Sequence, residues 1–311
     1  MGNLRSPNPG DDEVPTGLAA AHIGLNALLL SLSADYRGAG ANGYIYNLLR
    51  HLTKEDRQFR YTAFLGDRRF ESRGNMALYF TRWPAYGPAA RVLWEQGIQP
   101  LILWKERVDL IHGLAFVTPL FSPCPAVITV FDLSFLRFPQ AFRWLNRTYL
   151  RIFTSLSARR ARRVIAISEH TKDDVVRLLH VPAEKVEVIY CGVDEVFRPY
   201  PAAEVQAFRR RRGLSERFVL FVGTLEPRKN VQRLIEAFAL IKDLGYKLMV
   251  VGGKGWLYED IFATVEKLGL KDEVEFTGYV PAEELPLWYN AADLFVFPSL
   301  YEGFGLPPLE A

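Results

Sequence analysis

The stretch FVLFVGTLEPRKNVQRLIEAF, residues 218–238, carries the clearest fold signal in the chain. Its first six residues form an apolar run with the β-branched and aromatic content of a buried strand, and a polar loop and a helical pattern follow. A strand, a loop and a helix in this order are the repeating unit of parallel α/β sheets. The stretch therefore predicts an α/β fold around it.

The same alternation runs through the chain from about residue 22 onward. Helical patterns at residues 44–52 and 173–179 lie between strands predicted for IGLNALLL, YTAFLG, VDLIH, AVITVF, RVIAI and VEVIY. After an arginine-rich helix, the strands KLMVVGG, VEFTG and DLFVFP follow the opening stretch. We therefore predict two Rossmann-like domains, residues 22–195 and 196–311, facing each other across a cleft at the carboxyl ends of their strands. Residues 1–21 are predicted to form a flexible tail.

Composition sets limits on location and partners. The chain has 311 residues, of which 49% are hydrophobic and 23% charged, and its net charge of +3 predicts no general attraction to nucleic acid. Cys124 and Cys191 have neither metal-binding nor redox spacing, which favours a reducing compartment. Residues 17–34 have the apolar content of a signal peptide, but three acidic residues at 11–13 precede them. No other segment approaches the roughly 18 apolar residues of a membrane span, so we predict a cytoplasmic protein.

Two cations stand just before the helix of the opening stretch. Arg228 and Lys229 lie where the helix dipole disfavours positive charge, next to Asn230 as a predicted helix cap. An anion bound there resolves the conflict, because helix N–H groups and a guanidinium fork both favour phosphate oxygens. We predict a diphosphate site; a solvated basic turn is the alternative.

The segment SLYEGFGLPPLEA, residues 299–311, places two carboxylates around a turn. Glu302 is predicted to lie in a loop after a strand, and Glu310 on the first turn of a helix that the double proline begins. Gly303 and Gly305 let the backbone approach a ligand closely. Buried carboxylates are strong acceptors for polyol hydroxyls. The alternative, a tight turn with an acid near a helix N-terminus, accounts for Glu310 but not for Glu302.

Two loops in the first half are further candidates. RGAGANGYIYNLL places Gly38 and Gly40 between a strand and a helix, but the spacing departs from the strict GxGxxG pattern of dinucleotide sites, and Asn42 as a helix cap is the alternative. Asp132 follows the strand AVITVF, where it suits a hydrogen bond to a substrate hydroxyl or serves as a turn residue.

Two other polar residues are assigned to structure. Ser168 is predicted to be a helix cap, and His112 is predicted to be a structural histidine.

Residues 137–163 are strongly basic. They contain eight arginines and no acid, with aromatic residues among them. This composition suits peripheral contact with anionic lipid headgroups at the inner face of the membrane; an exposed helix is the alternative.

The chain has no Asp-x-Asp motif, so we predict that it binds a nucleotide diphosphate without a metal ion.

These features together resemble the retaining glycosyltransferases of family 4, which have the GT-B fold of two facing Rossmann-like domains. The segments that carry the resemblance are the glycine loop, VFDLSFLRFP, RVIAISEHTKDDV, VEVIYCGVDEVFRP, FVGTLEPRKNVQRLIEAF, EFTGYVP and ADLFVFPSLYEGFGLPPLEA. The carboxylate pair matches that family's E-x7-E motif. By this resemblance the first domain is the acceptor side and the second binds the nucleotide sugar.

The resemblance also implies roles for single residues. Glu302 would contact the donor sugar and Glu310 the ribose, while Arg228 and Lys229 would neutralise the diphosphate. The remaining donor contacts would come from Phe304, Gly305, Leu306, Gly38 and Gly40. Many relatives carry a histidine where this chain has Phe131, so Asp132 is kept as a catalytic candidate through an acceptor contact alone.

The implied activity is transfer of a hexose, with mannose from GDP-mannose first and a UDP-sugar as the alternative. The implied acceptor is a glycan or a lipid-linked sugar, and no cofactor is implied beyond the nucleotide sugar. An inactive sugar-nucleotide-binding fragment and a dinucleotide-dependent oxidoreductase are the other hypotheses. Because the family continues with more strands and helices, we also expect a truncated second domain in which Glu310 lacks support.

Overall fold

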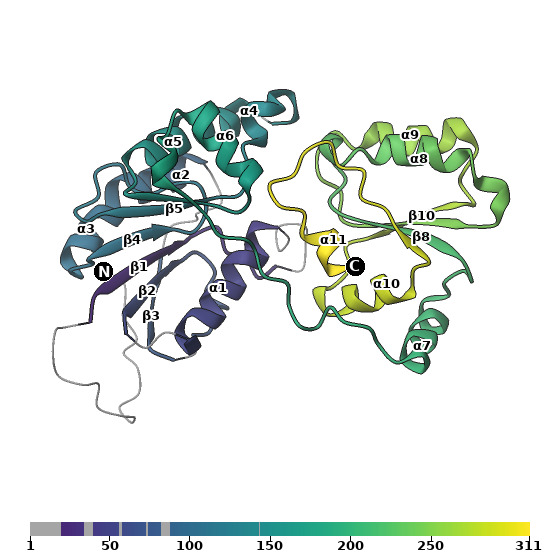
Figure 1. The fold of residues 1–311 in the computed structure, drawn as a ribbon, viewed down its shortest axis with the longest axis horizontal. Helices are drawn as coiled ribbons and strands as arrows, with labels where there is room; N and C mark the ends of the chain where they lie inside the picture. Colours follow the sequence, from purple (N-terminus) through teal and green to yellow (C-terminus); the bar gives the residue numbers. More distant parts are fainter. Residues whose placement is uncertain (1–19, 34–39, 56–57, 73, 82–87, 143) are drawn as a thin grey trace. The chain divides into compact units, whose positions relative to one another are not determined.

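A computed structural model describes residues 20–33, 40–55, 58–72, 74–81, 88–142 and 144–311. Gly38 therefore lies outside the described residues. The chain divides into two compact units between Tyr190 and Cys191, close to the boundary predicted at residue 195. Each unit contains its own parallel sheet with helices on both faces, as Figure 1 shows, and each is a Rossmann-like α/β domain.

The sheet of the first unit has the strand order β3-β2-β1-β4-β5-β6-β7, with every described pair parallel. Its strands are β1 (His22–Ala27), β2 (Arg60–Leu65), β3 (Met76–Phe80), β4 (Leu110–Gly113), β5 (Ala126–Val130), β6 (Arg163–Ala166) and β7 (Val186–Val188). Its longer helices are α1 (Ala41–Glu55), α3 (Gln99–Lys105), α5 (Trp144–Arg160) and α6 (Glu169–Leu179). Shorter ones are α2 (Pro88–Leu93), the π-helix η2 (Trp94–Ile98), α4 (Ser134–Arg137), and the 3-10 turns η3 (Pro139–Ala141) and η4 (Ala183–Lys185).

Helices cover both faces of this first sheet. On one face, Ile45 and Leu49 of α1 pack on Leu25 of β1 in one buried cluster. A second cluster joins Val130 of β5 to helices α5 and α6, where Val175 of α6 is fully buried. Since each buried side chain of this size contributes roughly 2 kcal/mol, these clusters fix the strands and hence the loops at their carboxyl ends.

The second unit repeats the arrangement with the order β10-β9-β8-β11. Its strands are β8 (Phe218–Val222), β9 (Lys247–Val251), β10 (Val274–Gly278) and β11 (Leu294–Phe295). Its α-helices are α7 (Ala202–Arg212), α8 (Val231–Ala239), α9 (Glu259–Leu268), α10 (Leu285–Ala291) and α11 (Leu306–Glu310). The 3-10 turns are η5 (Pro227–Lys229), η6 (Lys242–Leu244) and η7 (Ala282–Glu284).

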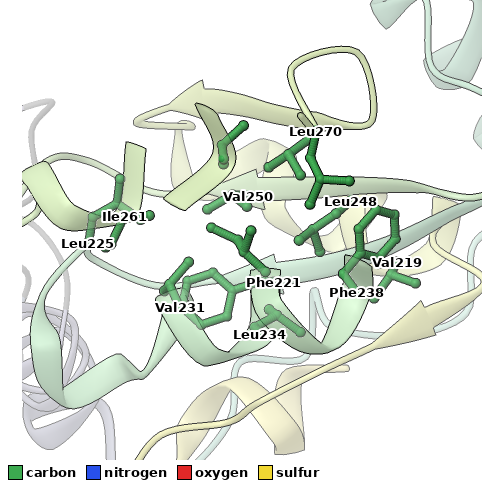
Figure 2. Packing of buried hydrophobic residues seen from close by; sticks show 13 residues of the cluster. Val219, Phe221, Leu225, Val231, Leu234, Phe238, Leu248, Val250, Ile261 and Leu270 are labelled. Carbon is green, nitrogen blue, oxygen red and sulfur yellow. The ribbon is translucent and has the colours of Figure 1, made fainter. Parts of the chain in front are cut away.

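The core of this unit lies on both faces of β8 and β9. Figure 2 shows Phe221 and Val250 packing against Leu234 and Phe238 of α8. On the other face, a separate cluster includes Trp288 of α10, whose ring meets that of Phe218 edge-on. Alternate residues of a single strand therefore serve the two cores, which is why the sequence shows a continuous apolar run rather than alternation.

Two glycines hold the loops after β8 and β9 together. A Cβ on Gly252 would lie 1.9 Å from the carbonyl oxygen of Gly223, so a larger residue would separate the loops. The N–H of Gly223 donates to Val251 at 2.9 Å, and that of Leu225 donates to Gly253 at 2.9 Å. This close contact supports the segment that carries Arg228.

Several local predictions can be compared with these elements. The predicted strands match observed ones, except that DLFVFP pairs only over the two residues of β11 and that β3 was missed. Ser168 is confirmed as a helix cap, since its Oγ accepts the N–H of Thr171 at 3.0 Å. His112 hydrogen-bonds Thr129 at 2.9 Å, joining β4 to β5, and burial lowers its pKa to about 4. The bond and the burial fit the structural role predicted for this histidine.

Candidate functional site

The loop after β8 presents Arg228 and Lys229 on the turn η5, at the carboxyl end of the strand. Asn230 follows in the left-handed region, with φ of 58°. The prediction that Asn230 caps α8 is wrong, because its side chain makes no cap bond. Its amide instead donates to the carbonyl of Pro298 at 3.1 Å, and the N–H of Leu300 donates to the carbonyl of Arg228 at 2.9 Å. These two bonds bind the loop after β8 to the loop after β11.

The joined loops bring four charged side chains into contact. Glu302 accepts hydrogen bonds from Arg228 Nη1 at 2.7 Å and from Lys229 Nζ at 2.6 Å. The other arm of Arg228 donates to Glu226 Oε1 at 2.6 Å, and its Nη1 also donates to the carbonyl of Tyr301 at 2.7 Å. Each of the four side chains is at most 20% exposed. We call Glu226, Arg228, Lys229 and Glu302 the charged cluster.

The two carboxylates of the charged cluster differ in their electrostatics. Burial acts to raise the pKa of Glu302, but Lys229 and Arg228 outweigh it and hold that pKa below its usual range. Burial prevails at Glu226, whose pKa is raised in spite of Arg228 and Lys229. Glu302 is therefore a carboxylate at neutral pH, balanced by two hydrogen-bonded cations.

This geometry suits the binding of an anion at the end of β8. A hydrogen bond to the buried Glu226 orients the guanidinium of Arg228. The Nζ atom of Lys229 lies 5.5 Å from the centre of the Phe297 ring. A phosphate oxygen could therefore take the place of the Glu302 carboxylate opposite both cations. Among the described residues, no group of three or more His, Cys, Asp or Glu side chains is arranged to hold a metal ion.

The closing segment places its second carboxylate elsewhere. Gly305 adopts a φ of 94° and precedes α11, in which the two prolines occupy the first turn as predicted. Glu310 is the fifth residue of α11, just past its first turn, so the predicted first-turn position is wrong. Its Oε2 accepts a hydrogen bond from the hydroxyl of Tyr289, on α10, at 2.9 Å. The structure thus gives Glu310 the support that the sequence led us to doubt, and burial raises its pKa while this bond lowers it.

The first-unit candidates have local roles. Asp132 follows β5, and its Oδ1 accepts the backbone N–H and the hydroxyl of Ser134 at 2.8 and 2.6 Å, which starts α4. Gly40, with φ of 63°, precedes α1. Asn42 is the second residue of α1 rather than the residue before the helix, and its Oδ1 accepts the N–H of Ser31 at 2.6 Å. Phe131 packs edge-on against the ring of Tyr44, with the ring centres 5.0 Å apart.

The structure therefore joins some of the predicted residues and leaves others separate. Arg228, Lys229 and Glu302 are in contact, and the segment of Phe304, Gly305 and Leu306 follows them directly. Sequence reasoning missed Glu226 and Tyr289. An acid two residues before an arginine of the predicted anion site was the available signal for Glu226. Nothing local marks Tyr289, since 21 positions separate it from Glu310.

Comparison with known proteins identifies relatives that transfer mannose. The chain is 29% identical over 249 residues to O-antigen chain mannosyltransferase B of Escherichia coli, covering 79% of this chain and 65% of that protein. It is 32% identical over 184 residues to O-antigen chain mannosyltransferase RfbU of Salmonella typhimurium, covering 59% of this chain and 48% of that protein. The match thus spans about half to two thirds of these relatives.

Solved structures agree on the fold, and family models identify the family. Sucrose-phosphate synthase of Thermosynechococcus elongatus superposes with a TM-score of 0.74 at 23% identity, over 93% of this chain and 78% of that one. The fold class is accordingly GT-B, with two Rossmann-like domains. The model described as Glycosyl transferases group 1 matches residues 204–311, within the unit that carries the charged cluster. The Glycosyltransferase Family 4 model matches residues 38–197, which make up more than half of this chain. The chain therefore belongs to Glycosyltransferase Family 4.

Proposed function

We propose that this chain transfers a hexose, mannose in the first place, from a nucleotide-diphosphate sugar to a glycan or lipid-linked acceptor. The observation that carries the proposal is the contact of Arg228 and Lys229 with Glu302 at the carboxyl end of β8. Ligands of open α/β sheets bind at this end of the strands. Two half-buried cations there provide positive charge for a diphosphate.

The proposed chemistry uses these cations to stabilise the leaving group. Negative charge grows on the nucleotide diphosphate as its bond to the sugar breaks, and preorganised cations stabilise that charge without reorganisation at the moment of reaction. Arg228 is already oriented by Glu226 and by the carbonyl of Tyr301. When a diphosphate binds, Glu302 gives up part of its contact with the cations and its carboxylate becomes available to the sugar hydroxyls.

The proposed donor contacts continue along the closing segment. The backbone of Phe304, Gly305 and Leu306 lies just after Glu302 and would line the sugar and phosphate groups, as the left-handed Gly305 permits close approach. Glu310, held by Tyr289, would accept hydrogen bonds from the ribose hydroxyls. Gly40 and Asp132, in the first unit, are proposed to contact the donor and the acceptor.

The relatives support mannose as the transferred sugar. Both relatives named above are mannosyltransferases of O-antigen chains. For this reason we propose GDP-mannose as the first donor. A UDP-sugar is the alternative donor.

We also propose that helix α5 contacts an anionic membrane surface. Trp144 is 71% exposed and Leu145 57%, and Arg151 and Ile152 are exposed two turns further along. Exposed aromatic and aliphatic side chains beside arginines suit the interface of an anionic bilayer. Within the residues that the structure describes, none of the helices has the length and apolar character to span a bilayer.

Donor binding tests the proposed function. Thermal-shift measurements with GDP-mannose, UDP-glucose and NAD should show the largest stabilisation with GDP-mannose, because only a bound ligand shifts the melting temperature. The same measurement after treatment with a chelator should give the same shift, since the charge is supplied by Arg228 and Lys229. A shift with NAD alone would overturn the proposal in favour of an oxidoreductase, and a shift that chelation abolishes would overturn the metal-independent version.

A further inference from the structure

A second group of cations lies in the first unit, around a cavity of about 690 Å³. The cavity lies at the amino ends of β5 and β6, where Ala126 and Arg163 begin the two strands. Asp132, by contrast, follows the carboxyl end of β5. Because ligands of α/β sheets are expected at the carboxyl ends, this cavity is separate from the proposed sugar-transfer site.

Four cationic side chains line the cavity: Arg160, Arg162, Arg163 and Lys185. They come from the end of α5, the start of β6 and the turn η4, so the fold gathers them from separate elements. In the part of the chain that the structure describes, no acidic side chain is among the lining residues. Four like charges around one hollow repel one another, and an anion bound there relieves that repulsion.

Among the described residues, no carboxylate forms an ion pair with any of these four side chains. Lys185 Nζ donates to the carbonyl of Arg159 at 3.2 Å, and Arg163 Nη1 donates to the carbonyl of Arg162 at 3.3 Å. The guanidinium of Arg160 lies 5.5 Å from the centre of the Phe121 ring. These are contacts with oxygens and a ring, which position the cations around the cavity.

Asp109, whose charge affects the lining residue Cys124, is not itself among the lining residues. Burial is the main cause that raises the pKa of Cys124, a lining residue, and the charge of Asp109 adds to it. Asp109 accepts the backbone N–H of His22 at 2.7 Å, so it is held by the start of β1.

The volume of the cavity and its apolar lining residues indicate the size and the non-phosphate part of the ligand. A volume of about 690 Å³ is in the range of small-molecule sites, roughly 300–1,000 Å³, and exceeds what a single ion needs. Pro119, Leu120 and Pro125 add apolar surface beside the cations. A ligand that combines a phosphate group with a carbon skeleton matches both parts.

We infer that this cavity is a binding site for an organic phosphate, with the phosphate among the four cations and the carbon portion against Pro119 and Leu120. Guanidinium groups suit this role because their planar fork matches phosphate oxygens. The phosphate has two possible sources, a soluble sugar or glycerol phosphate and the headgroup of a membrane lipid. Phe121, which is 78% exposed beside Arg160, would contact the acyl region in the second case.

The test measures binding of glycerol 3-phosphate to the full chain by titration calorimetry. The pocket variant is Arg162→Gln/Lys185→Gln, and the control is Arg68→Gln/Lys105→Gln, which removes the same charge from exposed positions outside the cavity. We expect the pocket variant to bind about tenfold more weakly and the control to bind like the unmodified chain. No binding by the unmodified chain, or an equal loss in both variants, would overturn the site.

Cys124 provides a local readout in the same experiment. Because Cys124 lines the cavity and Cys191 belongs to the second unit, glycerol 3-phosphate should slow alkylation of Cys124 and leave that of Cys191 unchanged. Equal rates at Cys124 with and without ligand would contradict the inference. Thermal unfolding of each variant checks that the glutamine substitutions preserve the fold.

Vesicles of phosphatidylcholine with one fifth phosphatidic acid distinguish the two sources. If the pocket variant loses both glycerol 3-phosphate and vesicle binding relative to the control, the site takes a lipid headgroup. If it loses only glycerol 3-phosphate, the site takes a soluble phosphate. Neither measurement uses sugar transfer, so the inference can fail while the proposed function stands, and the reverse.

Discussion

The ammonium group of Lys229 lies 2.6 Å from a carboxylate oxygen of Glu302, a residue 73 positions further along the chain. Arg228 holds the other oxygen of the same carboxylate at 2.7 Å. The cations proposed for the diphosphate and the carboxylate proposed for the sugar therefore contact each other. Binding of the proposed donor would change these contacts.

Replacing Lys229 with alanine should weaken binding of a nucleotide diphosphate by about 10- to 100-fold, while binding of the nucleoside should change little. A charged hydrogen bond contributes about 1.5–3 kcal/mol, and only the diphosphate makes it. Calorimetry with GDP and guanosine measures both affinities. Arg228→Ala should act in the same direction, but it also leaves the buried Glu226 without its partner, so Lys229→Ala is the cleaner variant.

Lys271→Ala is the control for this experiment, because Lys271 is an exposed residue of the same unit that pairs with Glu266. It should leave both affinities unchanged. Equal losses for GDP and guanosine in Lys229→Ala would show that Lys229 supports the fold rather than the diphosphate.

Tyr289→Phe should shift the acid limb of nucleotide binding to higher pH. Burial already raises the pKa of Glu310, and the hydroxyl of Tyr289 lowers it by donating a hydrogen bond. Removing that donor raises the pKa further, so the carboxylate proposed to bind ribose becomes protonated at a higher pH. The measurement is GDP affinity as a function of pH. Tyr246→Phe, which removes a hydroxyl that contacts Arg217, is the control and should leave the profile in place.

Glu95→Gln should flatten the pH dependence of stability in the first unit. Burial raises the pKa of Glu95 to about 7, against the opposing effects of Arg91, Tyr149 and Asn26. The folded chain therefore binds more protons than the unfolded chain between about pH 4.5 and 7, so the free energy of unfolding falls as pH rises through that window. The loss amounts to about 3 kcal/mol at 1.36 kcal/mol per pKa unit.

Urea unfolding at several pH values measures this slope. Glu71→Gln, at an exposed position, should keep the slope of the unmodified chain. The same slope in Glu95→Gln would mean that another group titrates in this range.

Gly252→Ala should destabilise the second unit by about 3 kcal/mol. Its Cβ would lie 1.9 Å from the carbonyl oxygen of Gly223, so the loops after β8 and β9 would separate. Gly245→Ala tests the backbone contribution alone, because Gly245 also has a positive φ but no atom within 4 Å of the added Cβ; it should cost about 1 kcal/mol. Urea unfolding compares the two, and equal costs would show that the close approach of the loops has no effect.

The sequence by itself determined the alternation of strands and helices, because an apolar run buried on both faces and a helical pattern are local signals. It also placed Arg228 and Glu302 in loops after strands, and it predicted the cap at Ser168. Two of the edge strands were harder to predict. β3 was missed, and β11 pairs over only two residues because the chain beyond it bonds to the loop after β8 through Asn230 and Arg228.

Only the tertiary structure decided which side chains meet. Glu226 and Tyr289 could not be assigned, since their roles depend on partners that folding brings within 3 Å. The same holds for the four cations around the cavity of the first unit, which come from separate elements. Charge, burial and pKa depend on distances in space, and a sequence pattern gives those distances only within one helix or strand.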